Sequence, residues 1–407
     1  SRHTPGGRRS APPPRRSQPL WLATLPPDRS GGPAAGRRRC AVPVGFDMGC
    51  ASSVAVEDCE DRAKAESLLR DCTLGEFDSK FSVGRELGTG GFAKVRAVRR
   101  RSDREHLAVK VMSPIPGKFG ATASDERNEL RSEVISELRA WSAVGSSDHV
   151  VRLVTAMAER RLFFIVMERC ECTIVEKIEA MPELWALQSQ RILKEMLLGV
   201  QACHLADVVH RDIKPDNFLV GTDGRTVKLC DFGLAAKLPS RGQLKGTCGT
   251  VPFMSPEMLK NSAYGKATDV WSYGCTAYML CYGELAFIPE RPTRDSMRRA
   301  ILAGAPPRRL QKGGGAAGFI EQLLERSPAV RPTVAEALAH PHLRGGCPAR
   351  VPAGVARQLD SEAGKCPHCL ASRGTFAASE STGTGGSTPE RQSSASSCHE
   401  DLGGSSG

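Results

Sequence analysis

The sequence has no apolar run long enough to cross a bilayer as a helix, which takes about 20 residues. The nearest candidate, Cys275 to Ile288, is interrupted by Gly283 and Glu284, so we expect a buried helix there. The first residues are rich in Arg and Pro and show no apolar centre of the kind found in secretory signals. The 15 cysteines follow no framework spacing, which is typical of reduced thiols in a cytosolic enzyme and argues against a disulfide scaffold.

Positive charge is concentrated in one part of the chain. The formal net charge is +11, but residues 1–48 contain nine Arg and two Asp, which leaves only +4 for residues 49–407. Residues 1–47 are rich in Pro, Arg and Gly and are expected to be disordered. Because the rest is nearly balanced, we expect no nucleic-acid partner. The 407 residues, 40% of them hydrophobic, otherwise have an ordinary soluble composition and suffice for one large or two ordinary domains.

Chemically distinctive side chains gather in one stretch, VHRDIKPDNFL at residues 209–219. A carboxylate, an amine and a carboxamide stand at Asp212, Lys214 and Asn217, and Asp231 opens a D-F-G tripeptide shortly afterwards. Carboxylate and carboxamide oxygens are hard ligands suited to Mg²⁺. An H-R-D tripeptide by itself arises by chance in long chains. The ordered set H-R-D-x-K-x-x-N and D-F-G, however, resembles the catalytic core of eukaryotic protein kinases.

This resemblance implies a role for each of these residues. Asp212 would accept a hydrogen bond from the substrate hydroxyl and orient it for in-line attack on the γ-phosphate of ATP. Lys214 would neutralise charge on the transferring phosphoryl group. Asn217 and Asp231 would bind the Mg²⁺ that bridges the phosphates. The implied cofactors are therefore ATP and Mg²⁺.

Upstream motifs extend the resemblance. The segment LGTGGFA, residues 87–93, lies between strands expected at 81–87 and 94–98, and its glycines let backbone amides approach phosphate oxygens. It resembles the kinase glycine-rich loop, with Ala93 in place of the third glycine. In the apolar strand expected at 107–111, Lys110 matches the kinase lysine that pairs with the α- and β-phosphates. Glycine turns are common, but a lysine inside an apolar run is hard to explain as surface decoration.

A helix expected from about 124 to 144 must supply the carboxylate that holds Lys110. Glu129, Glu133 and Glu137 recur at four-residue spacing and therefore share one face of this helix. Counting back from the strand expected at 149–153 favours Glu137. Glu133, one turn earlier, is the alternative.

The apolar segment 162–170 resembles the strand and hinge that join the two kinase lobes, although any core would need such a strand. The hinge backbone at Glu168 and Cys170 would hydrogen-bond adenine, and Met167 would lie at the back of the pocket. The full expected nucleotide-binding set is Leu87, Gly88, Thr89, Gly90, Gly91, Phe92, Ala93, Val95, Ala108, Lys110, Met167, Glu168, Cys170 and Leu219.

Residues 234–256 correspond to the kinase activation segment, which here ends in S-P-E, with Ser255 in place of the usual alanine. Arg211 resembles the arginine that grips an activation-loop phosphate through charge-assisted hydrogen bonds. Thr247 is the candidate phosphosite, although it lies one residue from the usual place, which Gly246 occupies.

Three further matches have structural roles in the family. Glu257 resembles the glutamate of a buried ion pair, and Arg331 fits its partner. Asp269, in the segment DVWSYG, matches the aspartate that braces the catalytic loop.

Met48-Gly49-Cys50 begins a match to the N-myristoylation pattern, in which Gly49 carries the acyl chain. Acylation needs a free N-terminal glycine, so we expect translation to start at Met48 and residues 1–47 to be upstream sequence. One myristoyl chain binds membrane only marginally, and the acidic segment 57–61 argues against a polybasic second signal. Palmitate on Cys50 is therefore expected. The alternative is a chance internal tripeptide. We therefore assign residues 48–80 to this lipidation motif and a linker, in which a short helix is expected at 57–72.

The C-terminal part, residues 344–407, is rich in Gly and Ser and is expected to be a disordered tail. Cys366 and Cys369 have the C-x-x-C spacing of zinc sites, but no second pair stands at a suitable distance, which favours a flexible tail. Some myristoylated kinases carry calcium-binding EF-hands after the kinase domain. No D-x-D-x-D-G loop is present here, so direct calcium control is not expected.

The resemblance covers about residues 81–343 and implies an α+β, two-lobed protein kinase-like fold. Its small lobe would be a β-sheet with one key helix, and its larger lobe mainly helical. Lys214 followed by Pro215 indicates transfer to serine or threonine hydroxyls, and the carboxylate of Asp216 hints at basic protein substrates. The enzyme is expected in the cytoplasm, at the cytoplasmic face of a membrane if acylated.

Two other functions fit parts of the sequence. In a pseudokinase acting as a membrane-tethered scaffold, the fold would only bind partners, but a scaffold gives no physical reason to keep Lys110, Asp212, Asn217 and Asp231 together. A small-molecule kinase sharing the fold is disfavoured by the S-P-E segment and Arg331, which belong to peptide-binding kinases.

Overall fold

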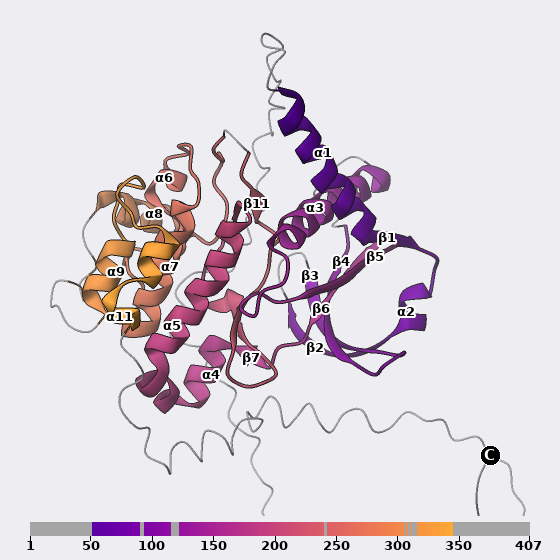
Figure 1. The fold of residues 1–407 in the computed structure, drawn as a ribbon, viewed down its shortest axis with the longest axis horizontal. Coiled ribbons are helices and arrows are strands. Elements are labelled where there is room, and N and C mark those ends of the chain that lie inside the picture. The colour runs from indigo at the N-terminus through magenta and orange to yellow at the C-terminus, as the bar shows by residue number, and fades with distance from the viewer. Residues whose placement is uncertain are drawn as a thin grey trace, which may run out of the picture.

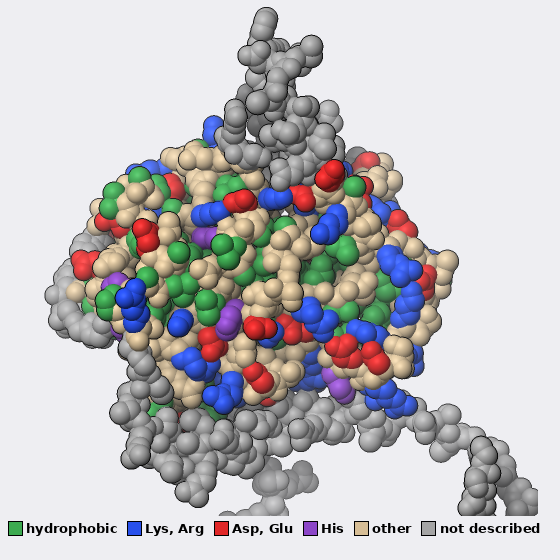
Figure 2. All heavy atoms as spheres, in the orientation of Figure 1, with side chains coloured by type: hydrophobic (Ala, Val, Ile, Leu, Met, Phe, Trp, Pro, Cys, Tyr) green, Lys and Arg blue, Asp and Glu red, His purple; other side chains and the backbone are tan. Residues whose placement is uncertain are grey.

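The computed structural model describes residues 51–89, 93–114, 122–239, 242–304, 307, 310 and 316–344. These residues form two lobes, one built on a β-sheet and one composed mainly of helices (Figure 1). This confirms the α+β, two-lobed fold predicted from the sequence. In the described part of the chain, no helix is both long enough and apolar enough to span a membrane. Basic and acidic side chains are interspersed over the face of the molecule shown in Figure 2.

The sheet lobe contains six strands in the spatial order β1-β5-β6-β4-β3-β2. Their bounds are β1 Leu69–Cys72, β2 Phe81–Thr89, β3 Ala93–Arg100, β4 His106–Met112, β5 Leu153–Glu159 and β6 Leu162–Glu168. All neighbouring pairs are antiparallel except β1 and β5, which are parallel. The central strands β4 and β6 are apolar and largely buried, as expected of strands covered on both faces.

Helix α3 (Ala123–Val144) shares an apolar core with this sheet and matches the helix predicted at 124–144. It begins after Thr122, whose side chain accepts a hydrogen bond from the backbone N–H of Asp125, and ends at Gly145, which has a φ of 70°. Its buried face carries apolar side chains at helical spacing, Leu130, Val134, Leu138 and Trp141. This face fixes which way the glutamates of α3 point.

The residues before the sheet differ from the predicted linker. They form α1 (Ala51–Leu68), β1 and α2 (Glu76–Lys80), so the helix predicted at 57–72 ends earlier and continues as a strand. The reason is tertiary, because β1 pairs with Ala156–Glu159 of β5. The carboxylate of Glu159 then accepts hydrogen bonds from the backbone N–H groups of Gly75 (2.7 Å) and Phe77 (3.3 Å), which fixes the start of α2.

The helical lobe is built around α7 (Ala267–Tyr282). Every residue of this helix from Thr268 to Met279 is buried, as expected of a helix that is covered on all sides. Gly283, with a φ of 70°, ends it, so the buried helix predicted at Cys275–Ile288 is confirmed only for its first part. The other helices are α4 Ile174–Ala180, α5 Pro182–Leu205, α6 Pro256–Leu259, α8 Arg294–Ala303, α9 Ala317–Leu323, α10 Val334–Leu338 and α11 Pro341–Arg344.

Short strands and turns between the lobes carry the predicted motifs. They are β7 Cys172–Thr173, β8 Val208–Val209, β9 Phe218–Val220, β10 Val227–Leu229 and β11 Ala236–Lys237, with 3-10 turns η2 Pro215–Asn217 and η3 Val251–Phe253. Strands β10, β9 and β7 form one small sheet, and β11 pairs with β8. The H-R-D motif therefore follows β8 directly, and the D-F-G motif lies between β10 and β11.

The strand predicted at 149–153 is wrong except for its last residue, where β5 begins. Val150 and Val151 are buried, which explains the apolar pattern. Their segment, however, crosses to β10 instead of joining the large sheet. The N–H of Val151 donates to the carbonyl of Leu229 (2.9 Å), and the N–H of Leu229 donates to the carbonyl of His149 (2.9 Å).

Candidate active site

Asp269 of α7 holds the H-R-D motif in place. Its carboxylate accepts hydrogen bonds from the backbone N–H groups of His210 (2.8 Å) and Arg211 (2.9 Å), and it lies 3.0 Å from Nε2 of His204. Arg211 has a φ of 65°, a left-handed conformation that is unfavourable for this residue type and needs such support. Burial acts to raise the pKa of Asp269, but the hydrogen bonds and positive charge around it hold the pKa below its usual value.

Asp212 lies in a closed set of hydrogen bonds. Its Oδ1 accepts from the backbone N–H (2.9 Å) and the hydroxyl (2.8 Å) of Thr250, and its Oδ2 accepts from Nζ of Lys214 (2.7 Å). The Lys214 ammonium also donates to the Thr250 hydroxyl at 3.0 Å. Burial alone lowers the pKa of Lys214, but the Asp212 carboxylate raises it above its usual value, so the amine stays protonated. Thr250 and Lys214 together fix the orientation of the Asp212 carboxylate.

Thr250 was not among the predicted site residues. Its local sequence gives no signal that separates it from the neighbouring Thr247, because its partners lie on a different segment. Gly249, just before it, makes the contact possible. This glycine has a φ of 98°, and a Cβ atom there would lie 2.4 Å from the carbonyl oxygen of Arg211. Only a glycine lets the segment approach the catalytic loop this closely.

Asn217 and Asp231, the predicted Mg²⁺ ligands, lie on adjoining segments, since the N–H of Cys230 donates to the carbonyl of Asn217 (2.9 Å). Nδ2 of Asn217 donates to the carbonyl of Asp212 (2.8 Å), which leaves Oδ1 as its metal-binding atom. The described residues contain no group of three or more His, Cys, Asp or Glu side chains that could hold a metal alone. The pair fits Mg²⁺, which commonly takes one or two protein oxygens and completes its coordination with phosphates and water.

Lys110 on β4 is held between two carboxylates. Its Nζ lies 2.8 Å from Oε1 of Glu137 on α3 and 2.9 Å from Oδ1 of Asp231. The carboxylate that contacts Lys110 is therefore Glu137, the favoured of the two predicted residues, and not Glu133. Burial acts to lower the pKa of Lys110, but the two carboxylates raise it above its usual value. Burial likewise acts to raise the pKa of Asp231, but the Lys110 ammonium lowers it below the usual value.

The D-F-G motif packs against this cluster through its other two residues. A Cβ atom on Gly233 would lie 3.3 Å from both the Lys110 amine and the Asp231 carboxylate, so a side chain there would crowd the ion pairs. Phe232 is fully buried, stacks on Trp141 of α3 with ring centroids 5.3 Å apart, and meets the His210 ring edge-on at 5.2 Å. This apolar stack connects α3 to the H-R-D motif.

The structure distributes the predicted nucleotide-binding residues over both lobes. Leu87, Gly88 and Thr89 lie on β2, Ala93 and Val95 on β3, Ala108 and Lys110 on β4, Met167 and Glu168 on β6, Cys170 just after it, and Leu219 on β9. Ala108 of β4 pairs with Met167 of β6, which places the two side by side. Burial, followed by the Glu168 carboxylate, raises the pKa of Cys170 to about 12, so its thiol stays protonated. Gly90, Gly91 and Phe92 lie outside the described residues.

The predicted modification sites are placed only in part. The Thr247 hydroxyl donates to the carbonyl of Met258 (3.1 Å). The Arg211 side chain donates to the carbonyl of Leu234 (2.6 Å) and lies 3.5 Å from the Tyr264 hydroxyl. Gly49 and Cys50 lie outside the described residues, as do the C-x-x-C cysteines at 366 and 369. Their proposed roles stay predictions.

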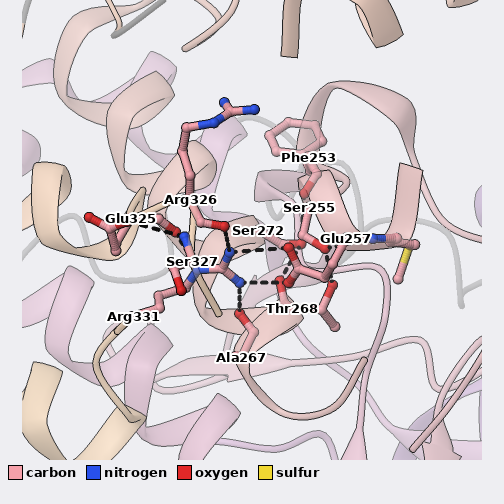
Figure 3. A network of polar contacts seen from close by, with 11 residues as sticks. Phe253, Ser255, Glu257, Ala267, Thr268, Ser272, Glu325, Arg326, Ser327 and Arg331 are labelled. Carbon is pink, nitrogen blue, oxygen red and sulfur yellow. Dashed lines mark hydrogen bonds and ion pairs between the residues drawn. The ribbon is translucent and has the colours of Figure 1, made fainter. Parts of the chain in front are cut away.

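Glu257 of α6 and Arg331 form a buried ion pair (Figure 3). Nη1 of Arg331 lies 2.7 Å from one carboxylate oxygen of Glu257, and Nη2 lies 3.2 Å from the other. The guanidinium also donates to the carbonyls of Ala267 and Glu325 and lies over the ring of Trp271, 5.2 Å from its centroid. The end of the activation segment is thereby fastened to α7.

Comparison with known proteins agrees with this geometry. The family described as protein kinase domain matches residues 81–343. Sperm motility kinase 3A of Mus musculus is 30% identical over 292 residues, which cover 70% of this chain and 54% of that protein. CBL-interacting protein kinase 20 of Oryza sativa subsp. japonica is 32% identical over 295 residues, which cover 70% of this chain and 61% of that protein. The chain spans about half the length of the curated relatives it matches.

The family match includes every part of the site described above, from Lys110 on β4 to Arg331 beside α7. It extends over more than half of the chain and confirms the resemblance found in the sequence. The catalytic loop, the D-F-G motif and the buried ion pair all lie within the matched residues. The chain belongs to the protein kinase family.

Proposed function

We propose that this protein transfers the γ-phosphate of ATP to serine or threonine hydroxyls of protein substrates, with Mg²⁺ bound at Asn217 and Asp231. The observation that carries the proposal is the hydrogen-bond set around Asp212, in which Thr250 and Lys214 fix the carboxylate. A fixed acceptor can hold an incoming hydroxyl in line with the phosphate, and positioning of this kind supplies most of the catalysis in phosphoryl transfer. Lys214 provides a positive charge beside the same position.

Lys110 supports the same reaction from the other lobe. Its pairing with Glu137 directs the ammonium toward the place where the family binds the α- and β-phosphates. Asp216, next to the catalytic loop, is exposed and supplies negative charge near the proposed substrate. We therefore propose that basic proteins are the substrates.

The test is Mg²⁺-dependent transfer of labelled γ-phosphate to a generic basic protein, comparing the natural chain with the variant Asp212→Asn. Label on serine and threonine that disappears in the variant supports the proposal, and label on tyrosine overturns the assigned acceptor. Equal background with both chains contradicts catalysis in that preparation. If ATP then binds without turnover, the pseudokinase scaffold is the better description.

We also propose that the protein is cytoplasmic and held at the membrane by acylation of Gly49, with palmitate on Cys50 as the second anchor. The support is the sequence pattern together with the marginal membrane affinity of a single myristoyl chain. The test is metabolic labelling with an alkyne myristate in cells that express the chain from Met48. Label and membrane sedimentation lost in Gly49→Ala support tethering, whereas labelling that is equal in both chains overturns it.

A further inference from the structure

We infer that Asp61 on α1 is a positioning residue for the kinase reaction, because it joins α3, which carries Glu137, to β11, which follows the D-F-G motif. This inference rests on the proposed function and concerns how its site is kept assembled. Helix α1 precedes residue 81, where the family match begins, so the shared domain does not supply this contact.

Helix α1 crosses α3 and packs against it (Figure 1). Among the residues from 60 to 69, the least exposed are Asp61, Ala65, Leu68 and Leu69, which share one face of the helix and its end. Ala65 and Leu69 are 0% and 3% exposed and belong to the same core as Leu130 and Leu138 of α3. The packing is therefore specific, and it brings Asp61 to the end of α3 that carries Glu137.

The Asp61 carboxylate contacts cations from two different elements. Its Oδ2 forms an ion pair with Nζ of Lys237 on β11 and lies 4.0 Å from Nη2 of Arg139 on α3. The three side chains are only 22–27% exposed, so solvent screens these contacts less than it screens a surface pair. One carboxylate thus connects three elements that are far apart in the sequence.

Both cations stand close to the catalytic groups along the chain. Arg139 follows Glu137 by two residues on α3, and Lys237 follows Asp231 by six. The backbone of Lys237 pairs with Val208, just before the H-R-D motif. A shift of α3 relative to β11 would therefore pull Glu137 and Asp231 apart around Lys110. Asp61 opposes that shift because it holds both sides at once.

A second ion pair from the same N-terminal segment also holds α3 in place. Asp71 of β1 accepts two hydrogen bonds from the Arg131 guanidinium, at 2.7 and 2.9 Å, and lies 3.7 Å from Nη2 of Arg127. These arginines alternate with the glutamates of α3 at four-residue spacing. Asp71 thus fixes the first half of α3, and Asp61 fixes the half next to Glu137.

The experiment uses the full chain and compares Asp61→Asn with Asp61→Glu and with Glu66→Gln. Glu66 lies on the same helix, is 46% exposed and pairs with Arg62 of its own helix at 3.0 Å, so it is the matched control. We expect kcat/KM for ATP to fall roughly 2- to 30-fold in Asp61→Asn, the range found for residues that couple to a site from outside it. The conservative variant Asp61→Glu and the control Glu66→Gln should keep most of the natural kcat/KM for ATP.

A charge exchange tests whether Asp61 acts through its ion pair with Lys237. Asp61→Lys and Lys237→Asp should each lower kcat/KM, and the double variant should recover at least half of the loss, whereas additive losses would show that the two side chains act independently. Thermal unfolding of each chain checks that the loss is not global. Values of kcat/KM in Asp61→Asn that equal those of Glu66→Gln overturn the inference.

The proposed function can fail independently of this inference. If the natural chain binds nucleotide but transfers no phosphate, the affinity for a fluorescent ATP analogue replaces kcat/KM as the measurement. A weaker affinity in Asp61→Asn, restored in Asp61→Glu, would then support the positioning role even though the assignment of catalysis is wrong. Equal affinities in all three chains would overturn the positioning role.

Discussion

Asp212 and Thr250, 38 residues apart, are joined by two hydrogen bonds to the same carboxylate oxygen. One comes from the backbone N–H of Thr250 and fixes the position of the activation segment against the catalytic loop. The other comes from its hydroxyl, which also accepts from Lys214. The orientation of the proposed catalytic carboxylate therefore depends on a side chain outside the H-R-D motif.

Replacing Thr250 by valine should lower kcat for phosphate transfer by roughly 10- to 100-fold, since a hydrogen bond to a charged group contributes about 1.5–3 kcal/mol. Thr250→Ser keeps the hydroxyl and should keep most of the activity. Steady-state kinetics at saturating ATP measure kcat for both variants. If the valine and serine variants are equally active, the hydroxyl has no part in orienting Asp212.

Glu137→Gln should reduce kcat/KM for ATP by roughly 10- to 100-fold, because the Lys110 ammonium loses one of its two charged partners. Glu133→Gln, one turn earlier on the same helix, is the matched control and should lower kcat/KM far less, because Glu137 and not Glu133 forms the ion pair with Lys110. The measurement is initial rate against ATP concentration. A larger effect at Glu133 would show that the wrong glutamate has been assigned.

Arg331→Met should destabilise the helical lobe by about 3–5 kcal/mol, because it leaves the Glu257 carboxylate buried without its partner. The double variant Glu257→Leu with Arg331→Met removes both charges and should recover much of this loss. Urea unfolding at pH 7 measures both. The control is Arg62→Ala, which breaks an exposed pair and should cost less than about 1 kcal/mol. If Arg331→Met lowers the free energy of unfolding by as little as Arg62→Ala does, the buried ion pair does not have the stabilising role assigned to it.

The pKa of Asp269 lies below its usual value of 3.8 in the folded chain, so the unfolded chain takes up this proton first as the pH falls. The stability from the ionised carboxylate is fully present above about pH 4 and is lost as the pH falls through the folded-state pKa. Asp269→Asn lacks this titration. The difference in unfolding free energy between the natural chain and Asp269→Asn should therefore narrow below pH 4. A difference that stays constant from pH 6 to pH 3 would contradict the assigned shift.

Thr247→Ala tests the phosphorylation hypothesis. The hydroxyl now donates to the Met258 carbonyl, a contact that a phosphate would break, and the hypothesis is that Arg211 would then pair with the phosphate. If phosphorylation activates the enzyme, the alanine variant purified from eukaryotic cells should lose activity while binding ATP normally. Unchanged activity would remove the hypothesis. Mass spectrometry of the natural chain establishes whether the site is occupied.

The sequence alone determined the family, the two-lobed fold and the residues that carry the proposed chemistry. Asp212, Lys214, Asn217 and Asp231 stand in short motifs of fixed spacing, which the sequence displays directly. The helix at 124–144 was also predictable, since its apolar residues recur with helical period.

Only the tertiary structure decided which glutamate meets Lys110. Helical spacing puts Glu129, Glu133 and Glu137 on one face, and the choice among them depends on how α3 packs on the sheet. The same limit explains the error at 149–153, where burial against β10 gives the same apolar pattern as a sheet strand. Hydrophobic pattern reports burial, and it does not report the partner.

The contacts of Thr250 and Asp61 were likewise beyond the sequence. Each acts on segments far away in the chain, Thr250 on the catalytic loop and Asp61 on α3 and β11. The four residues of β1 show no alternating pattern of their own. They form a strand because they pair with the edge of β5. The sequence gives the chemistry of each side chain. Its contacts with residues far away in the chain are determined only by the packing of the whole fold.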